Sequence, residues 1–510
     1  MTKRNKVRSF AFGALFVVAA MIGLTVWAVS SPVGSDPDGS FHLNSIWCGQ
    51  GTRVGLCEDP PPEQADTRPK TIMTPVGIAA AGQCFAFRAL DSAACEASTI
   101  EAKNLVPNQF NNEGRLYPNG YYWVASHLVG DGIVRSAMLV RVFNILLLLG
   151  LLVLLRRVAQ PAIFPATTLA LLMTWVPFGL FLVASNNGSS WTLTGVGLFW
   201  AFFANALQST ERVKAALSWL GAAICAAMAV GSRVDGSIYI PIVACVVLLI
   251  SWTNIPSQRM RVVGVAATAL TGLVGAVTYL QSGQSGSLTA GLNAGASFGR
   301  STMDVLWVNL FRLPGYFLGI YGISGFGSGL GWLDTPMEPL TWLLMIGAVA
   351  ALVARSSRRL DWQNRLGVGL LIAACVAIPM YMFLLDGAIV GENIQSRYVL
   401  PLVTVLFAVF ALQTVRTDNP WSLTTTSRVA LTAAVTVAHA AALHINMRRY
   451  ISGLDVWSPN LNKAREWWPT WLPSPNLCWI IGSLAMGVVT YLIFFREITT
   501  EKPVAAETES

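Results

Sequence analysis

The sequence predicts an all-α polytopic membrane protein of about twelve transmembrane helices, with a large disulfide-bearing loop after the first helix. Hydrophobic residues make up 54% of the 510 residues and charged residues only 12%. That charge content is about half of what an average soluble domain carries. The apolar residues come in runs of roughly 16–24, a length that crosses a hydrocarbon core as a helix. The period-two alternation that a membrane-spanning barrel would need is absent.

The apolar runs set the expected spans and the domain boundaries. Spans are expected at 10–30, 133–155, 162–184, 191–207, 215–231, 237–252, 262–280, 339–354, 366–385, 398–415, 429–447 and 477–495. Lys and Arg follow the positive-inside rule if the N-terminus is cytoplasmic. This predicts a cytoplasmic N-terminus (1–9), an uncleaved first helix (10–30), an extracytoplasmic loop (31–132), a multi-helix transmembrane domain (133–495) and a disordered cytoplasmic tail (496–510).

The net charge of +8 does not indicate a nucleic-acid partner, because the basic residues are spread over short loops between spans. Two further segments on the outer side are too long to be simple connections, namely 281–338 and 448–476. Long loops tend to carry function. The first contains aromatic residues among glycines and is expected to form one or two interfacial helices. The second is rich in Trp and suits the membrane interface.

Four of the eight cysteines fall in the first outer loop, namely Cys48, Cys57, Cys84 and Cys95. An even cluster in an extracytoplasmic loop predicts two disulfides. Three pairings are possible, of which Cys48–Cys57 with Cys84–Cys95 closes the shortest loops. The alternative, a metal site, is disfavoured because no pair has C-x-x-C spacing.

An acidic run opens the first outer loop. Asp36, Asp38 and His42 stand within seven residues, immediately after the first helix. Paired carboxylates serve as a general base or as ligands of a divalent metal such as Mg²⁺ or Mn²⁺. The structural alternative is an acidic Asp-Pro-Asp-Gly turn. Asp36 and Asp38 are the candidate catalytic residues, and no cofactor is certain.

Other polar residues gather at the outer ends of the expected helices, which makes them candidates for substrate binding. Outer arginines oppose the positive-inside bias, and Arg holds phosphate groups with two parallel hydrogen bonds. Anionic lipid headgroups are the alternative partner. The candidates, together with His42, are Arg233, Asp235, Arg312, Asp334, Glu392, Arg397, Tyr398, His444 and Arg448.

The order of these motifs resembles a bacterial family of predicted multispanning membrane proteins, domain of unknown function 2142, grouped with the GT-C superfamily of membrane glycosyltransferases. The resemblance covers nearly the whole chain. It is carried by 32–42, 185–188, 331–336, 395–401 and 444–450. The family pattern after the first helix is similar to Pro-Asp-Glu-x-x-His. Asp38 and His42 match it, whereas Gly39 stands at the Glu position and Asp36 would supply the second acid.

The resemblance implies a GT-C-like enzyme of the bacterial cell membrane. Such enzymes take a sugar from a polyprenyl-phosphate donor and transfer it, outside the membrane, to an envelope glycan or glycolipid acceptor. Asp38 or Asp36 would then be the base, and arginines would hold the lipid phosphate. Two other hypotheses remain open: a transporter or flippase of a lipid-linked glycan, and a noncatalytic membrane scaffold. Neither the donor sugar nor the acceptor follows from the sequence.

Overall fold

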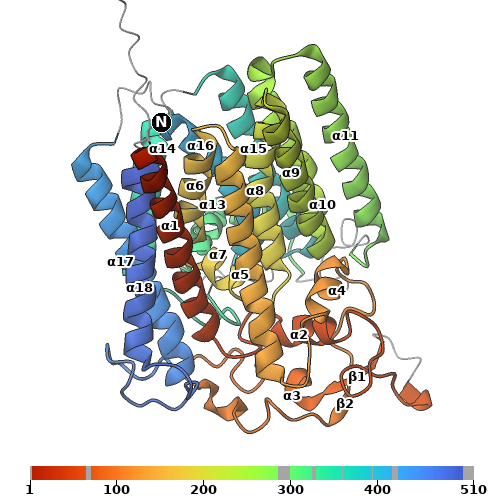
Figure 1. Ribbon diagram of the computed structural model, residues 1–510. Coiled ribbons are helices and arrows are strands. Elements are labelled where there is room, and N and C mark those ends of the chain that lie inside the picture. The colour runs from red at the N-terminus through yellow and green to blue at the C-terminus, as the bar shows by residue number, and fades with distance from the viewer. Residues whose placement is uncertain are drawn as a thin grey trace, which may run out of the picture.

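A computed structural model describes residues 3–64, 70–284, 299–323, 329–357, 360–392, 394–415 and 423–497. Long helices run side by side as one bundle, and a lobe of short helices and two strands covers one end of it (Figure 1). The N-terminus lies at the opposite end of the bundle (Figure 1). We call these the lobe end and the N-terminal end.

Nine helices in the described part of the chain are long and apolar enough to cross a membrane. Each coincides with one of the expected runs, so the multi-pass prediction is confirmed. They are α1 (Lys3–Val29), α5 (Ile133–Val158), α9 (Arg212–Ser232), α10 (Val234–Ser251), α11 (Gln258–Gln281), α14 (Pro339–Ser356), α15 (Trp362–Asp386), α17 (Thr425–Ile451) and α18 (Pro475–Leu492).

The other three expected spans form helices that are either short or buried inside the bundle. The run at 162–184 is divided into α6 (Ile163–Trp175) and α7 (Phe178–Val183). Pro177 has no N–H to continue the helix and holds Val176 in an extended conformation (φ −85°, ψ 119°). The run at 398–415 forms α16 (Leu400–Val415), which has only 16 residues.

α8 (Ser189–Gln208) occupies the run at 191–207 and lies inside the bundle. All of its residues up to Leu207 are buried, and it packs against α9, α10 and α16. A count of spans from hydropathy cannot separate such a helix from one that faces lipid, because it depends on composition and not on neighbours.

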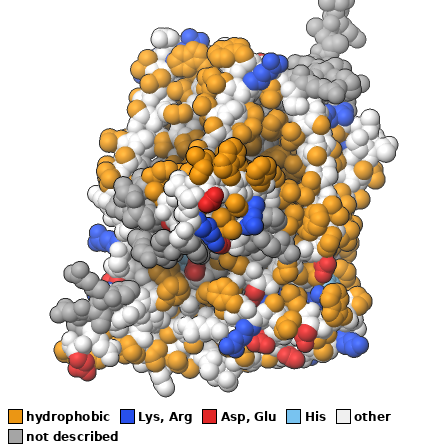
Figure 2. Space-filling model, turned by 180° about the vertical axis from the view of Figure 1, so that it is seen from behind, with side chains coloured by type: hydrophobic (Ala, Val, Ile, Leu, Met, Phe, Trp, Pro, Cys, Tyr) orange, Lys and Arg blue, Asp and Glu red, His pale blue; other side chains and the backbone are white. Residues whose placement is uncertain are grey.

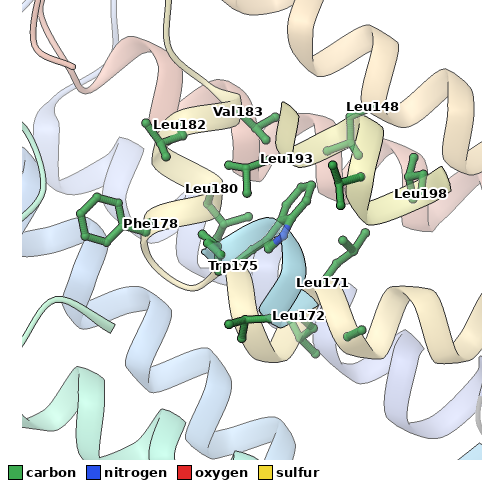
Figure 3. Packing of buried hydrophobic residues seen from close by; sticks show 14 of the residues in the cluster. Leu148, Leu171, Leu172, Trp175, Phe178, Leu180, Leu182, Val183, Leu193 and Leu198 are labelled. Carbon is green, nitrogen blue, oxygen red and sulfur yellow. The ribbon is translucent and has the colours of Figure 1, made fainter. Parts of the chain in front are cut away.

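Close packing holds the centre of the bundle together where α6 ends. Figure 3 shows Trp175 among Leu171, Leu180 and Leu193, and its indole N–H donates to the hydroxyl of Thr404 in α16 at 3.1 Å. Lipid tails are as apolar as these side chains, so their contribution comes from van der Waals contact rather than from removal from water.

The lobe is formed by the first loop, as expected from its length and cysteines. It contains α2 (Gly39–Trp47), α3 (Val76–Ala79), α4 (Gly120–Ser126) and the 3₁₀ turn η2 (Ala93–Glu96). Strands β1 (Ile72–Pro75) and β2 (Leu105–Asn108) pair antiparallel, with Ile72 opposite Asn108. Two disulfides, Cys48–Cys57 and Cys84–Cys95, close short loops within it. The prediction of two disulfides is confirmed, and the pairing is the shortest-loop one.

The two other long segments differ from each other. The first contains one amphipathic helix, α13 (Thr302–Leu318). It exposes Met303, Trp307 and Phe311 and buries Val305 and Asn309 on the opposite face, whereas residues 285–298 and 324–328 lie outside the described part. Its placement flat on a membrane stays a prediction. Residues 452–474 contain no regular helix or strand.

The surface agrees with a membrane-embedded bundle. Figure 2 shows a rear face covered mainly by hydrophobic side chains, with a small group of charged side chains near its middle. Charged side chains at the N-terminal end are mainly Lys and Arg, whereas both signs occur at the lobe end (Figure 2). The tail was expected at 496–510; residues 496 and 497 end a π-helical turn, Ile493–Glu497, and 498–510 lie outside the described residues.

Candidate functional site

The acidic run is fixed at the lobe end by Arg141, a residue of α5. Its guanidinium is 1% exposed and donates to the carbonyl oxygens of Ala28, Ser31 and Pro32 at 2.6–2.7 Å. Its Nε donates to Asn186 Oδ1 at 2.9 Å. These bonds set the direction in which the chain leaves α1. Our sequence reasoning missed Arg141, although an Arg inside an apolar run is itself a functional signal.

Each of the four later motifs contacts the segment 31–38. In the motif at 185–188, the Asn187 side-chain amide donates to the carbonyl of Pro37. In the motif at 331–336, the Trp332 indole donates to the carbonyl of Gly34. From the last motif, the Tyr450 hydroxyl donates to the carbonyl of Ser35. In the motif at 395–401, the Arg397 guanidinium lies 3.8 Å from the Asp38 carboxylate. Segments up to 415 residues apart thus converge on one short stretch.

Asp36 and Asp38 occupy opposite environments. Asp36 is fully buried, and neither of its carboxylate oxygens has a hydrogen-bond partner in the described part of the chain. Burial raises the pKa of Asp36 to about 6, although Arg141 and Arg397 oppose the rise. Asp38 has a left-handed backbone (φ 58°, ψ 28°), and its side chain is 48% exposed. Only Asp38 is therefore placed to meet a substrate from solution.

Arg397 faces Asp38 across the site. Its Nη2 lies 3.8 Å from Asp38 Oδ2, and its side chain is 3% exposed. Among the described residues, its Nε and Nη1 have no hydrogen-bond partner. A buried guanidinium with unused donors is costly unless an anion completes its bonds. Arg397 is consequently the strongest anion-binding candidate of the site.

Arg233 lies beside Arg397, because both guanidiniums stack on the ring of Tyr398. Their Cζ atoms lie 5.3 and 5.4 Å from its centroid. Arg233 also stacks on Tyr117 at 5.1 Å. Its Nε donates to both oxygens of Asp235 at 3.2 Å. Arg233 is therefore hydrogen-bonded to its carboxylate partner, whereas Arg397 faces Asp38 at 3.8 Å, beyond hydrogen-bond distance.

His42 is a buried neighbour of the site and hydrogen-bonds to Tyr122. It is 2% exposed, and its Nδ1 shares a hydrogen bond of 2.9 Å with the Tyr122 hydroxyl. Burial lowers the pKa of His42 well below its usual value, and the nearby Arg233 and Arg397 lower it further. The imidazole is neutral at physiological pH, which suits positioning of the lobe rather than proton transfer to a substrate.

A family model described as a predicted membrane protein, DUF2142, matches residues 21–406. The chain belongs to the DUF2142 family. The matched region contains the acidic run, Arg141, Arg233 and Arg397. No curated protein and no solved structure matches the chain.

A tight turn in this DUF2142 chain accounts for Gly39 at the position where the pattern Pro-Asp-Glu-x-x-His has Glu. A Cβ at Gly39 would lie 2.6 Å from the carbonyl oxygen of Gly34 and 2.8 Å from its Cα. Gly34 itself has a left-handed φ of 73° and packs against Ala81. The turn between the two glycines is too tight for any side chain at position 39 in this conformation. Asp36, the other acid of this turn, lies on its buried side.

The donor set around the acidic run does not fit a divalent cation. Within the described residues, no group of three or more His, Cys, Asp and Glu is arranged to hold a metal. The carboxylate of Asp38 already faces the cation of Arg397, whereas Mg²⁺ and Mn²⁺ need several oxygen ligands. No step of the chemistry proposed for this DUF2142 chain is therefore assigned to a metal.

Several predicted site residues lie apart from the Asp38–Arg397 pair. Asp334 forms a buried ion pair with Arg449 at 2.7 Å, which links the motif at 331–336 to α17. Glu392 pairs with Arg300 at 2.7 Å, and Arg312 donates weakly to the Val390 carbonyl nearby. The Arg300 guanidinium lowers the pKa of Glu392. These ion pairs and the Arg312 hydrogen bond connect loops and helices near the site.

His444 and Arg448 lie on another face of α17. Residues 446, 449 and 450 share the helix face that contacts the lobe, whereas 444 and 448 are turned away from it. His444 contacts the Pro459 carbonyl at 3.0 Å, and Arg448 stacks on Trp457. The structure brings Asp36, Asp38, His42, Arg233, Asp235, Arg397 and Tyr398 together and leaves His444 and Arg448 facing the Trp-rich loop.

Proposed function

We propose that the chain is a membrane glycosyltransferase of the GT-C type, working at the outer face of the bacterial cell membrane. It would move a sugar from a polyprenyl-phosphate donor to an envelope glycan or glycolipid acceptor. The observation that carries the proposal is the exposed Asp38 carboxylate 3.8 Å from the buried guanidinium of Arg397, because one group can accept a proton while the other holds a phosphate.

In the proposed reaction, the ionised carboxylate of Asp38 acts as general base and takes the proton of the acceptor hydroxyl. The acceptor oxygen forms a bond to the anomeric carbon from the face opposite the phosphate. The bond between that carbon and the phosphate oxygen breaks, and its electron pair stays on the polyprenyl phosphate. The configuration at the anomeric carbon is therefore inverted. Arg397 stabilises the charge that develops on the leaving phosphate.

The orientation of the bundle supports an outer site. The charged side chains visible at the N-terminal end are mainly basic (Figure 2), as expected for a cytoplasmic face. Disulfides in the lobe suit an oxidising compartment. Both termini are then cytoplasmic, and the Asp38 site faces outward.

The buried helix α8 inside the bundle disfavours a flippase. Alternating access requires a central polar cavity that opens to either side. α8 is buried from Ser189 to Leu207 and packs on three neighbouring helices. Mutation distinguishes a noncatalytic scaffold from an enzyme, because a scaffold would keep its role after the loss of Asp38.

The test is transfer by the full-length protein in nanodiscs, with radiolabelled polyprenyl-phosphate hexoses as donors and an envelope extract as acceptor. Asp38→Asn is expected to lower the rate by roughly 10²–10⁴-fold, as for other lost general bases. Asp91→Asn is a matched control, because Asp91 is 52% exposed and lies 3.9 Å from Arg88. Wild-type transfer by Asp38→Asn would exclude Asp38 as the base, and glycan scrambling without transfer would favour the flippase.

A further inference from the structure

A pocket with a mainly apolar lining and a few charged side chains lies at the lobe end, and Asp38 does not line it. Its volume is about 370 Å³, within the range of small-molecule sites. It is enclosed by the ends of α1 and α5, by η2 and by the loop at 466–471. The residues that matter for its chemistry are Glu96, Arg141, Glu466, Trp467, Trp468 and Trp471. We call it the Trp pocket.

Glu96 is the unexplained group of this pocket. Glu96 is 5% exposed, and among the described residues no side chain hydrogen-bonds to its carboxylate, on which the backbone of Gly82 acts as a donor. Burial raises the pKa of Glu96 to about 8, although the charge of Arg141 and the backbone of Gly82 oppose the rise. The side chain is therefore a neutral carboxylic acid at pH 7, with one O–H to donate and lone pairs to accept. A buried acid without a side-chain partner is costly unless a ligand satisfies it.

One wall of the Trp pocket is aromatic. Trp471 is 64% exposed, and Trp467 and Trp468 are half-buried. The indole N–H of Trp468 is already used, since it donates to the Pro473 carbonyl at 2.8 Å. Glu466 accepts a hydrogen bond of 2.5 Å from the Ser92 hydroxyl and adds acceptor oxygens at the rim. Apolar indole faces together with acidic oxygens in one pocket match a ring with C–H faces and hydroxyl edges.

We propose that the Trp pocket binds a neutral sugar ring, with its C–H face on the indoles and its hydroxyls on Glu96 and Glu466. A cationic ligand fits poorly, because the Arg141 guanidinium lines the same pocket. The site is separate from Asp38, which does not line it, and binding there does not depend on transfer.

The face of α5 indicates that the sugar is carried by a membrane lipid. Val134 and Met138 line the Trp pocket, and further along the same helix face Leu148, Leu149 and Leu152 line a narrow apolar crevice of about 70 Å³. α1 borders both spaces. An alkyl chain attached to the sugar could therefore lie along α5, deeper in the bundle.

Binding is tested by saturation-transfer NMR on the full-length protein in amphipol, with the methyl glycosides of glucose, galactose and mannose as probes. Saturation of aromatic protons is expected to reach the sugar C–H protons. Trp471→Ala should weaken binding roughly three- to tenfold, the effect of one lost aromatic contact. Trp457→Ala is the matched control, because Trp457 is exposed in the same loop and does not line the pocket.

Variants of Glu96 test the hydrogen bonds independently of the aromatic wall. Glu96→Gln keeps a donor and an acceptor and should retain binding, whereas Glu96→Leu should abolish it. Asp38→Asn should bind normally, so failure of the proposed transferase and failure of the sugar pocket are distinguishable. Absence of saturation transfer from every glycoside, or equal transfer in Trp471→Ala and wild type, would overturn the proposal.

A comparison of probes separates a lipid-borne sugar from a free glycan. Octyl β-D-glucopyranoside, used below its micelle concentration, is expected to bind at least tenfold more tightly than methyl β-D-glucopyranoside, because burial of several additional CH₂ groups is favourable. Trp471→Ala should weaken the binding of both probes and leave this difference in place, because Trp471 does not line the apolar crevice. Equal affinities of the two probes would assign the pocket to a free glycan and reject the lipid.

Discussion

Replacing Asp36 with Asn should stabilise the protein at neutral pH while leaving its stability in acid unchanged. Asp36 is fully buried, and its oxygens lack hydrogen-bond partners among the described residues. Its pKa rises from 3.8 to about 6, because burial outweighs the attraction of Arg141 and Arg397, and Asp38 adds a smaller repulsion. At 1.36 kcal/mol per unit, a rise of about two units means that ionised Asp36 costs about 3 kcal/mol in the folded state.

The pH range follows from the two pKa values. Below pH 3.8 both the folded and the unfolded states hold the proton, and Asp36 costs nothing. Between 3.8 and about 6 the unfolded chain releases the proton while the folded chain keeps it, so the free energy of unfolding falls as the pH rises. Above pH 6 the loss is complete. The Asn side chain does not ionise, and Asp36→Asn escapes this loss.

The assay is thermal unfolding in a nonionic detergent from pH 4 to 8, followed by tryptophan fluorescence. The melting temperature of Asp36→Asn should exceed that of wild type by a few degrees at pH 7–8, and the difference should vanish near pH 4. Asp91→Asn is the control, because it makes the same exchange at a carboxylate that is 52% exposed. An Asp36→Asn variant that is less stable than wild type at pH 7 would refute the reasoning, since ionised Asp36 would then be stabilised by its arginines.

Three further outcomes follow from the packing at the lobe end. Asp334→Ala leaves the buried guanidinium of Arg449 without its partner at 2.7 Å and should cost about 3–5 kcal/mol, seen as a lower melting temperature. Gly39→Ala forces a Cβ to within 2.6 Å of the Gly34 carbonyl and should cost about 1–3 kcal/mol; an unchanged melting temperature would show that the turn can relax. Cys84→Ser opens a disulfide with a sequence separation of 11 and should cost about 3 kcal/mol, whereas dithiothreitol should have no added effect on that bond in the variant.

The fold was predictable because its elements are local in sequence. Apolar runs located the membrane helices, and four cysteines in one outer loop indicated two disulfides, as the structure confirms. What composition cannot give is the environment of a helix. α8 has the same apolar character as its neighbours and yet lies wholly inside the bundle, and Pro177 divides one expected span into two helices.

The site was predictable only as a set of candidates at one end of the bundle. Alternation of the spans placed Asp38 and Arg397 on the same side, but their contact joins residues 359 positions apart, and nothing in either local sequence encodes it. For the same reason His444 and Arg448 were grouped with them, although they face the Trp-rich loop. The role of Arg141 was not predicted because its partners are mainly backbone carbonyls, which a pattern of side chains does not reveal.

The turn between Gly34 and Gly39 assigns different roles to the two acids. Absence of a Cβ at Gly39 lets the backbone close tightly, and the left-handed conformation at Asp38 leaves its carboxylate half-exposed beside Arg397. The same turn places Asp36 on the buried side, near Arg141. In the proposed transfer, the exposed Asp38 is therefore the acid that exchanges a proton with the acceptor, whereas Asp36 stays buried near Arg141 and Arg397.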